Sequence, residues 1–206
     1  MHHRDIARLA PLRGYVRTLR QQELPLLRDH LLRLGPHSRH DRFNGFLGDS
    51  FIERYAAKCA SDGTLVVAYL EDGVVRGAAE LHSPEQSPDG LPEIAFSVEA
   101  MVRRRGVGSS LFQRLIAEAR LKGYGALRIT TSAENQAMRA LAGKFGAQLN
   151  FVRGESTGTI DLKPPSQLEL AKLAIAAPAD SLRAAINLNR VYWKAVLRMY
   201  GWGRAA

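Results

Sequence analysis

The stretch Val98-Glu-Ala-Met-Val-Arg-Arg-Arg-Gly-Val-Gly-Ser-Ser-Leu-Phe112 decides the fold, because it predicts a strand that runs through a glycine turn into a helix. Upstream, Ile94, Phe96 and Val98 alternate with small or polar residues, which is the two-residue period of a half-buried strand. Downstream, apolar residues recur at helical spacing as far as Lys122-Gly123, where a basic last turn and a glycine predict the end of the helix.

The turn itself is suited to binding a pyrophosphate. Gly106 and Gly108 have no side chain to hold an anion away from the backbone, and the positive end of the following helix points at it. Arg103, Arg104 and Arg105 add positive charge nearby. The alternative is a tight turn whose glycines serve only geometry and whose arginines face water. The turn lacks both the lysine of a Walker loop and the third glycine of a dinucleotide-binding fingerprint.

The pattern Arg103-x-x-Gly106-x-Gly108 resembles the acyl-CoA loop of the GNAT superfamily of N-acetyltransferases. The resemblance continues through the helix, the strand Leu127-Arg-Ile-Thr130 and the block Glu134-Asn-Gln-Ala-Met-Arg-Ala-Leu141. It implies a mixed α/β GNAT fold, in which a central, mostly antiparallel sheet is flanked by helices. It also implies an acetyl-CoA-dependent N-acetyltransferase, with acetyl-CoA as the acyl donor substrate.

The chain of 206 residues is expected to have three parts. These are an N-terminal segment, 1–11, a GNAT domain, 12–163, and a C-terminal helical extension, 164–206, that begins at Pro164-Pro165 and packs on the core or pairs subunits in a homodimer. Within the domain, periodicity predicts strands at 14–19, 64–70, 74–81, 126–131, 148–152 and 157–162, and helices at 21–34, 50–57 and 134–145.

Composition limits the classes of function. Hydrophobic residues make up 46% and charged residues 24% of the chain, as in ordinary globular proteins, and no apolar run is long enough to span a membrane. We therefore expect a cytoplasmic protein without a membrane partner. The net charge of +9 favours anionic partners, but no RNA-binding aromatic motif or zinc-finger spacing is present, so nucleic acid is a disfavoured partner.

Cysteine and histidine usage predicts no metal chemistry. The single cysteine, Cys59, excludes an internal disulfide and is expected to be a structural thiol. The histidines have no metal-ligand spacing, so no metal site is expected. No Ser-His-Asp or Cys-His order stands out, which favours direct acyl transfer over an acyl-enzyme.

The resemblance implies a set of cofactor contacts. The pantetheine would lie along the strand that ends near Val98, the pyrophosphate would bind backbone amides of the turn, and Asn135 would both cap its helix and contact the CoA arm. The expected cofactor-binding residues are Val98, Arg103, Arg104, Arg105, Gly106, Val107, Gly108, Ser109, Asn135 and Met138.

A protonated amine acceptor needs a base, and Glu93 is the expected one. It opens the strand Glu93-Ile-Ala-Phe96, which resembles the Glu-x-Ala setting of GNAT enzymes that acetylate protein lysines. Burial there would favour proton uptake. The alternative is a solvated carboxylate at the start of a strand, and Glu80 and Glu99 are weaker candidates. Many relatives have a tyrosine seven residues after the asparagine as general acid, where this chain has Ala142.

The resemblance favours a protein lysine as acceptor, because Ser38–Phe43 and the block from Glu93 to Met138 are most similar to that branch. A polyamine or aminoglycoside is a second candidate acceptor. It would require an acidic cleft, to which the chain could contribute Asp41, Asp49, Glu53, Glu80 and Glu85. Two further functions fit the sequence less well, a non-catalytic acyl-CoA-binding regulatory module and a basic nucleic-acid-binding protein.

Overall fold

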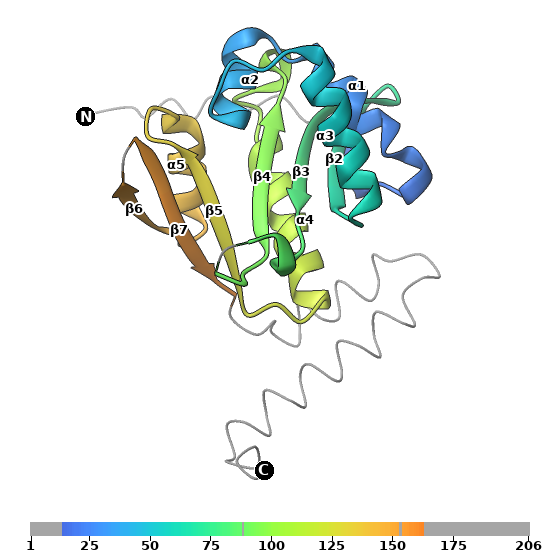
Figure 1. The fold of residues 1–206 in the computed structure, drawn as a ribbon. Coiled ribbons are helices and arrows are strands. Elements are labelled where there is room, and N and C mark those ends of the chain that lie inside the picture. The colour runs from blue at the N-terminus through green and yellow to red at the C-terminus, as the bar shows by residue number, and fades with distance from the viewer. Residues whose placement is uncertain (1–13, 88, 153, 163–206) are drawn as a thin grey trace, which may run out of the picture. The chain divides into compact units, whose positions relative to one another are not determined.

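The structure is a computed structural model that describes residues 14–162, except residues 88 and 153 (Figure 1). The expected N-terminal segment, 1–11, and C-terminal extension, 164–206, lie outside the described residues.

The described residues form a mixed α/β fold, with a seven-stranded sheet in the order β1-β2-β3-β4-β5-β7-β6. The strands are β1 (Tyr15–Thr18), β2 (Leu65–Glu71), β3 (Val74–Leu81), β4 (Glu93–Val98), β5 (Ala126–Ser132), β6 (Gln148–Val152) and β7 (Glu155–Asp161). The helices are α1 (Pro25–Arg33), α2 (Pro36–Phe43), α3 (Asp49–Ser61), α4 (Val107–Leu121) and α5 (Gln136–Lys144), with short 3-10 turns η1 (Gln21–Glu23), η2 (Pro84–Gln86) and η3 (Ala100–Val102). Strands β4 and β5 are parallel, whereas the pairs β1–β2, β5–β7 and β6–β7 are antiparallel. The expected fold class is confirmed.

The described residues divide into two compact units, 14–80 with 95–112, and 81–94 with 113–162. The boundaries fall inside β3, β4 and α4.

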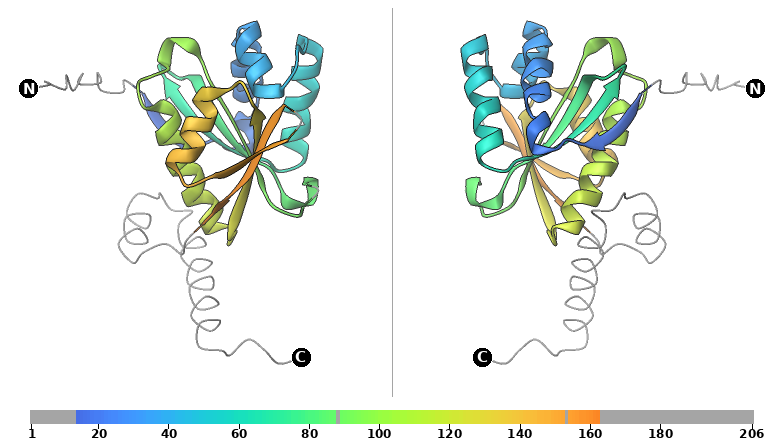
Figure 2. Two further views of the ribbon diagram at one scale, coloured as in Figure 1. Left: turned by 90° about the vertical axis from the view of Figure 1, so that its left-hand side faces the viewer. Right: turned by 90° about the vertical axis from the view of Figure 1, so that its right-hand side faces the viewer.

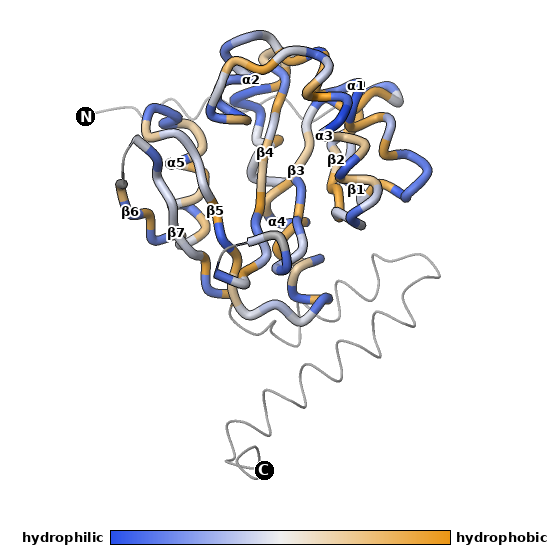
Figure 3. The backbone as a smooth tube through the Cα atoms, viewed as in Figure 1, coloured by the Kyte–Doolittle hydropathy of each residue, from blue (hydrophilic) through white to orange (hydrophobic). Residues whose placement is uncertain are grey.

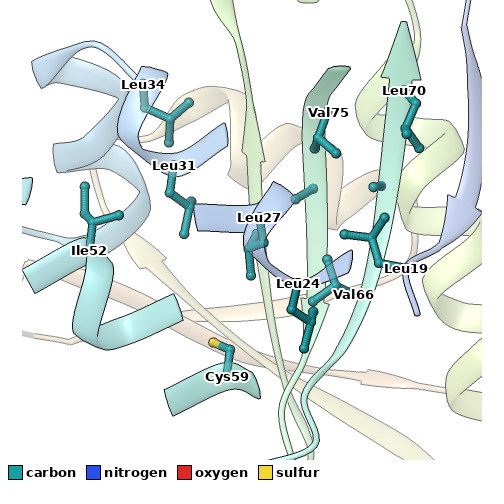
Figure 4. Close-up of a cluster of buried hydrophobic side chains, with 12 residues drawn as sticks. Leu19, Leu24, Leu27, Leu31, Leu34, Ile52, Cys59, Val66, Leu70 and Val75 are labelled. Carbon is teal, nitrogen blue, oxygen red and sulfur yellow. The ribbon is translucent and has the colours of Figure 1, made fainter. Parts of the chain in front are cut away.

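The core of the first unit is a leucine cluster between α1, α3 and the strands β2 and β3. Leucines recur along α1 at helical spacing, so that Leu27 and Leu31 lie on one face and are fully buried. They pack with Ile52, Cys59 and Val66 (Figure 4). Figure 3 shows hydrophobic positions of α1 and α3 interspersed with hydrophilic ones, as expected of helices with one buried face.

The second unit is built on the antiparallel strands β5, β7 and β6, with α5 beside them (Figure 2). Leu127 and Ile129 of β5 and Ile160 of β7 are buried, in keeping with the two-residue period of these strands. Arg128 lies between the two buried β5 residues and therefore on the opposite face of the strand.

Local signals placed most elements to within a few residues. The Asp72-Gly73 turn has φ of 52° and 76° at its two residues, as the favoured two-residue hairpin requires. The helix expected from residue 21 begins as the 3-10 turn η1, and α1 starts at Pro25, since proline suits the first helical position. The helix expected from residue 134 starts at Gln136, because Asn135 is its cap.

Candidate functional site

The glycine turn adopts the backbone that its sequence predicts. After β4 the chain passes through η3, and α4 begins at Val107 directly after Gly106. Gly106 has φ of +86°, where a side chain is strained, and a Cβ there would meet no other atom within 4 Å. The hydrogen bond from Ser110 N–H to Gly106 O (3.0 Å) opens the helix. The amides of its first turn therefore point out of the N-terminus, as anion binding requires.

The three arginines of the turn have different surroundings. Arg103 donates from Nε to Val98 O (2.9 Å) and from Nη2 to Ser38 Oγ of α2 (2.6 Å). Arg105 Nη2 lies 3.5 Å from a Glu71 carboxylate oxygen. Arg104 is exposed, with φ of 59°. Arg103 thus ties the end of β4 to α2, which the sequence did not predict.

The expected base, Glu93, is the first residue of β4, and its side chain is 35% exposed. It is therefore less buried than the sequence led us to expect. Its Oε1 lies 4.0 Å from Arg128 Nε on β5, and Glu93 and Arg128 are register partners in the parallel pair. Phe96 stacks on Phe112 of α4 with ring centroids 4.8 Å apart. Because side chains alternate along a strand, Glu93 projects from the face opposite Phe96.

A buried polar network joins α1 to the other end of β4. His30 Nε2 lies 2.9 Å from Ser97 Oγ, and His30 Nδ1 lies 3.2 Å from Glu99 Oε1. Arg33 Nε and Arg76 Nη1 donate to the same carboxylate at 3.0 and 2.8 Å. Burial by itself would raise the pKa of Glu99, but hydrogen bonds from His30 and Arg76 outweigh it and lower this pKa to about 2. Such a carboxylate is a poor base near neutral pH.

This arrangement of Ser97, His30 and Glu99 was not predicted from the sequence, because 67 residues separate His30 from Ser97. The sequence signal is the two-residue period of the strand. Ser97 lies on the same face of β4 as Glu93, and the polar Glu99 follows two residues later, directly after the strand. Ser97 is only 7% exposed and His30 is fully buried, so a substrate has no access to this serine. The network joins α1 to β4.

A second buried cluster joins α2 and α3 to β3. Glu80 is fully buried and accepts hydrogen bonds from Arg42 Nη2 (2.9 Å) and Tyr55 Oη (2.5 Å). The Arg42 guanidinium also lies over the Phe43 and Tyr55 rings, 4.7 and 5.2 Å from their centroids. Burial, with the nearby Glu80 charge, raises the pKa of Cys59 to about 11. The thiol is therefore protonated at neutral pH, as expected of a structural cysteine.

A cavity of about 440 Å³ opens beside α2. It is lined by Leu34, Pro36, Arg39, Phe46, Leu47 and Gly48. Its one charged lining residue, Arg39, is engaged by Asp49 (2.6 Å), Leu34 O (2.9 Å) and Leu32 O (2.5 Å). The Phe46 side chain is 83% exposed. The cavity therefore offers a mainly apolar surface.

In the second unit, Asn135 caps α5 as predicted, because its Oδ1 accepts the Met138 N–H at 3.0 Å. Ala142, where many relatives have a tyrosine, is fully buried. The structure thus places Val98 and the turn, 103–109, in the first unit, and Glu93, Asn135 and Met138 in the second.

The described part of the chain has neither a metal-binding cluster nor a membrane-spanning helix. No three or more of its His, Cys, Asp and Glu side chains are grouped so that they could hold a metal ion. None of its helices combines the length and the apolar character needed to cross a membrane.

Several solved structures are similar to this fold. The GNAT domain of S. lividans PAT has a TM-score of 0.60 at 20% identity, covering 72% of this chain and 90% of that one. A putative acetyltransferase from Salmonella typhimurium with its cofactor acetyl-CoA has a TM-score of 0.54 at 18% identity, covering 75% and 97%. A phosphinothricin acetyltransferase from Sinorhizobium meliloti in complex with acetyl-CoA has a TM-score of 0.55 at 16% identity, covering 76% and 95%.

A family model shows the relationship directly. The model of the acetyltransferase (GNAT) family matches residues 28–147, which include α2 to α5, most of α1, the glycine turn and Glu93. The chain therefore belongs to the GNAT family of acetyltransferases, enzymes that use acetyl-CoA as acyl donor.

Proposed function

We propose that this protein transfers the acetyl group of acetyl-CoA to the side-chain amine of a protein lysine, with Glu93 as general base. The observation that carries the proposal is the position of Glu93, a partly exposed carboxylate on the strand that leads into the glycine turn. The buried Glu80 and Glu99 are held in ion pairs instead.

A base is needed because a lysine amine with an ordinary pKa of about 10.4 is mostly protonated at neutral pH. Forming the reactive amine costs about 4 to 5 kcal/mol. In the proposed reaction, Glu93 takes this proton directly or through one water. The amine nitrogen then attacks the thioester carbonyl carbon, the C–S bond breaks, and CoA leaves as a thiolate. The nitrogen gives its second proton to solvent water as the amide forms. Ala142 provides no proton for this thiolate, so the proposal includes no tyrosine acid.

On the donor side, we assign the pyrophosphate to the first amides of α4, at Val107 and Gly108. The positive φ of Gly106 and the open space beside it support this assignment. Asn135 and Met138 are proposed to contact the CoA arm. The Asn135 carboxamide oxygen caps α5, and its NH₂ group is the proposed donor to CoA.

On the acceptor side, the cavity beside α2 supports a protein or peptide substrate. Its mainly apolar lining suits an apolar side chain of such a substrate. A polyamine or aminoglycoside needs available carboxylates, and of those suggested by the sequence Glu80 is fully buried and paired with Arg42. The proposal also includes a cytoplasmic location, in keeping with a single, buried cysteine, and pairing of subunits in a homodimer.

Release of CoA thiol, measured with acetyl-CoA and a panel of lysine peptides, polyamines and aminoglycosides, tests the proposal. Peptides with an apolar residue beside the lysine should be the best substrates. Glu93→Gln should lower kcat about 100-fold or more while CoA affinity is kept. The matched control is Glu155→Gln, an exposed glutamate at the start of β7. Full activity in Glu93→Gln would exclude this base, and CoA binding without turnover on any amine would favour the regulatory module.

A further inference from the structure

Asp89, in the loop between β3 and β4, contacts Arg128 of β5. Asp89 Oδ2 lies 2.6 Å from Arg128 Nη1, and both residues belong to the second unit. The loop itself orients Asp89, because its Oδ1 accepts hydrogen bonds from Ser87 Oγ (2.7 Å) and the Leu91 N–H (3.3 Å). The Ser87 hydrogen bond, aided by Arg128, lowers the pKa of Asp89 to about 2. Asp89 is therefore ionised over the whole working pH range.

Arg128 lies between this loop and Glu93. It is the register partner of Glu93, and partners in a parallel pair project to the same face of the sheet. Its Nε is 4.0 Å from Glu93 Oε1, which is too long for a hydrogen bond. This Nε is buried and makes no hydrogen bond among the described residues. The guanidinium thus donates a short hydrogen bond to Asp89 and none to Glu93.

The choice between these two carboxylates matters for catalysis. A guanidinium that hydrogen-bonds a carboxylate stabilises its ionised form and makes it a weaker base. If the Arg128 side chain turned toward Glu93, its N–H groups would donate hydrogen bonds to the carboxylate that must accept the lysine proton. The Asp89 carboxylate accepts a hydrogen bond from Arg128 Nη1 and balances the positive charge of the guanidinium.

We propose that Asp89 is a positioning residue, which holds Arg128 away from hydrogen-bonding distance of Glu93 and so keeps that carboxylate able to accept a proton. This inference rests on the proposed role of Glu93 as base. In this proposal, the β3–β4 loop influences the reaction through the contact of Asp89 with Arg128 of β5.

The groups next to Glu93 in its unit are Arg128, Asp89 and His82. The backbone N–H of His82 donates to the Glu93 carbonyl at 2.8 Å. His82→Gln is therefore included in the experiment as a further control on the pH profile.

The experiment measures kcat/KM from pH 5 to 9 with acetyl-CoA and the best peptide. Asp89→Asn should move the acid limb of the profile to lower pH by about one unit, and the plateau should fall several-fold because the base is weaker. Arg128→Gln should move the limb the opposite way. The double variant Asp89→Asn/Arg128→Gln should follow Arg128→Gln, and Asp89→Glu should restore the wild-type profile at least in part.

Thermal melting and CoA binding separate this role from loss of structure, and Asp161→Asn, an exposed aspartate at the end of β7, is the matched control. An unmoved acid limb in both Asp89→Asn and Arg128→Gln would overturn the inference, while an inactive Glu93→Gln would leave the proposed base in place. Full activity in Glu93→Gln would instead remove the base and this inference together. If Asp89→Asn fails to fold, Arg128→Gln and Ser87→Ala provide the test.

Discussion

Glu80 and Glu99 of the first unit differ from Glu93 of the second unit in how they contact arginine. In the first, Glu80 and Glu99 are buried and accept hydrogen bonds from guanidinium groups at 2.8 to 3.0 Å. In the second, Glu93 is 35% exposed and lies 4.0 Å from its arginine. The first arrangement holds helices on the sheet and fixes the charge of the carboxylate. The second leaves the Glu93 carboxylate without a hydrogen bond from its arginine, as the proposed role of general base requires.

The largest expected effect is on stability, at Glu80. Glu80→Gln leaves the Arg42 charge buried without its counter-charge, which should lower the free energy of unfolding by about 3 to 5 kcal/mol. Urea denaturation measures this loss. A double variant, Arg42→Met with Glu80→Leu, should recover much of it, since it removes both charges. A loss below about 1 kcal/mol in Glu80→Gln would mean that this ion pair does not hold α2 and α3.

Acid should weaken the first unit through Glu99. Its pKa in the folded protein, about 2, lies below the ordinary value of 4.5, so its contribution is present above pH 4.5 and is lost as pH falls toward 2. The difference amounts to about 3 kcal/mol. The wild type should lose more stability than Glu99→Gln between pH 5 and 2, as measured by denaturation at each pH. Parallel pH curves for the two proteins would contradict this ionised, buried state.

The glycine turn provides a test on the donor side. Gly106→Val places a β-branched residue at φ of +86°, which should cost about 1 to 3 kcal/mol and weaken CoA binding measured by calorimetry. Gly125→Ala is the control, because a Cβ there meets no atom within 4 Å and its φ is not in the left-handed region. Unchanged CoA affinity in Gly106→Val would mean that the glycine turn does not take part in binding the acyl donor.

The smallest expected effect on stability is at Glu93. Glu93→Gln should change the free energy of unfolding by less than about 0.5 kcal/mol, because the Arg128 contact is long and partly exposed to solvent. Combined with the loss of turnover expected for this variant, that result would sharpen the contrast with Glu80. A stability loss as large as that of Glu80→Gln would mean that Glu93 is a structural residue.

Elements with a local signal could be predicted from the sequence. The period of β4, the glycine at the turn and the apolar spacing of α4 each depend on neighbouring residues, and so does the Asn135 cap. The local pattern at Glu93 correctly placed it at the start of its strand. It did not predict the partial exposure, because exposure depends on which segments cover the side chain.

By itself, the sequence determined the order of most strands and helices, the glycine turn before α4 and the resemblance to GNAT enzymes. Only the tertiary structure decided which charges meet: Asp89 pairs with Arg128 across 39 residues, and His30 with Glu99 across 69. The physical reason is the separation along the chain of the residues that interact. Backbone conformation follows from hydrogen bonds and steric contacts within a few residues, whereas the charge state and the exposure of a side chain depend on neighbours that folding brings from distant parts of the chain.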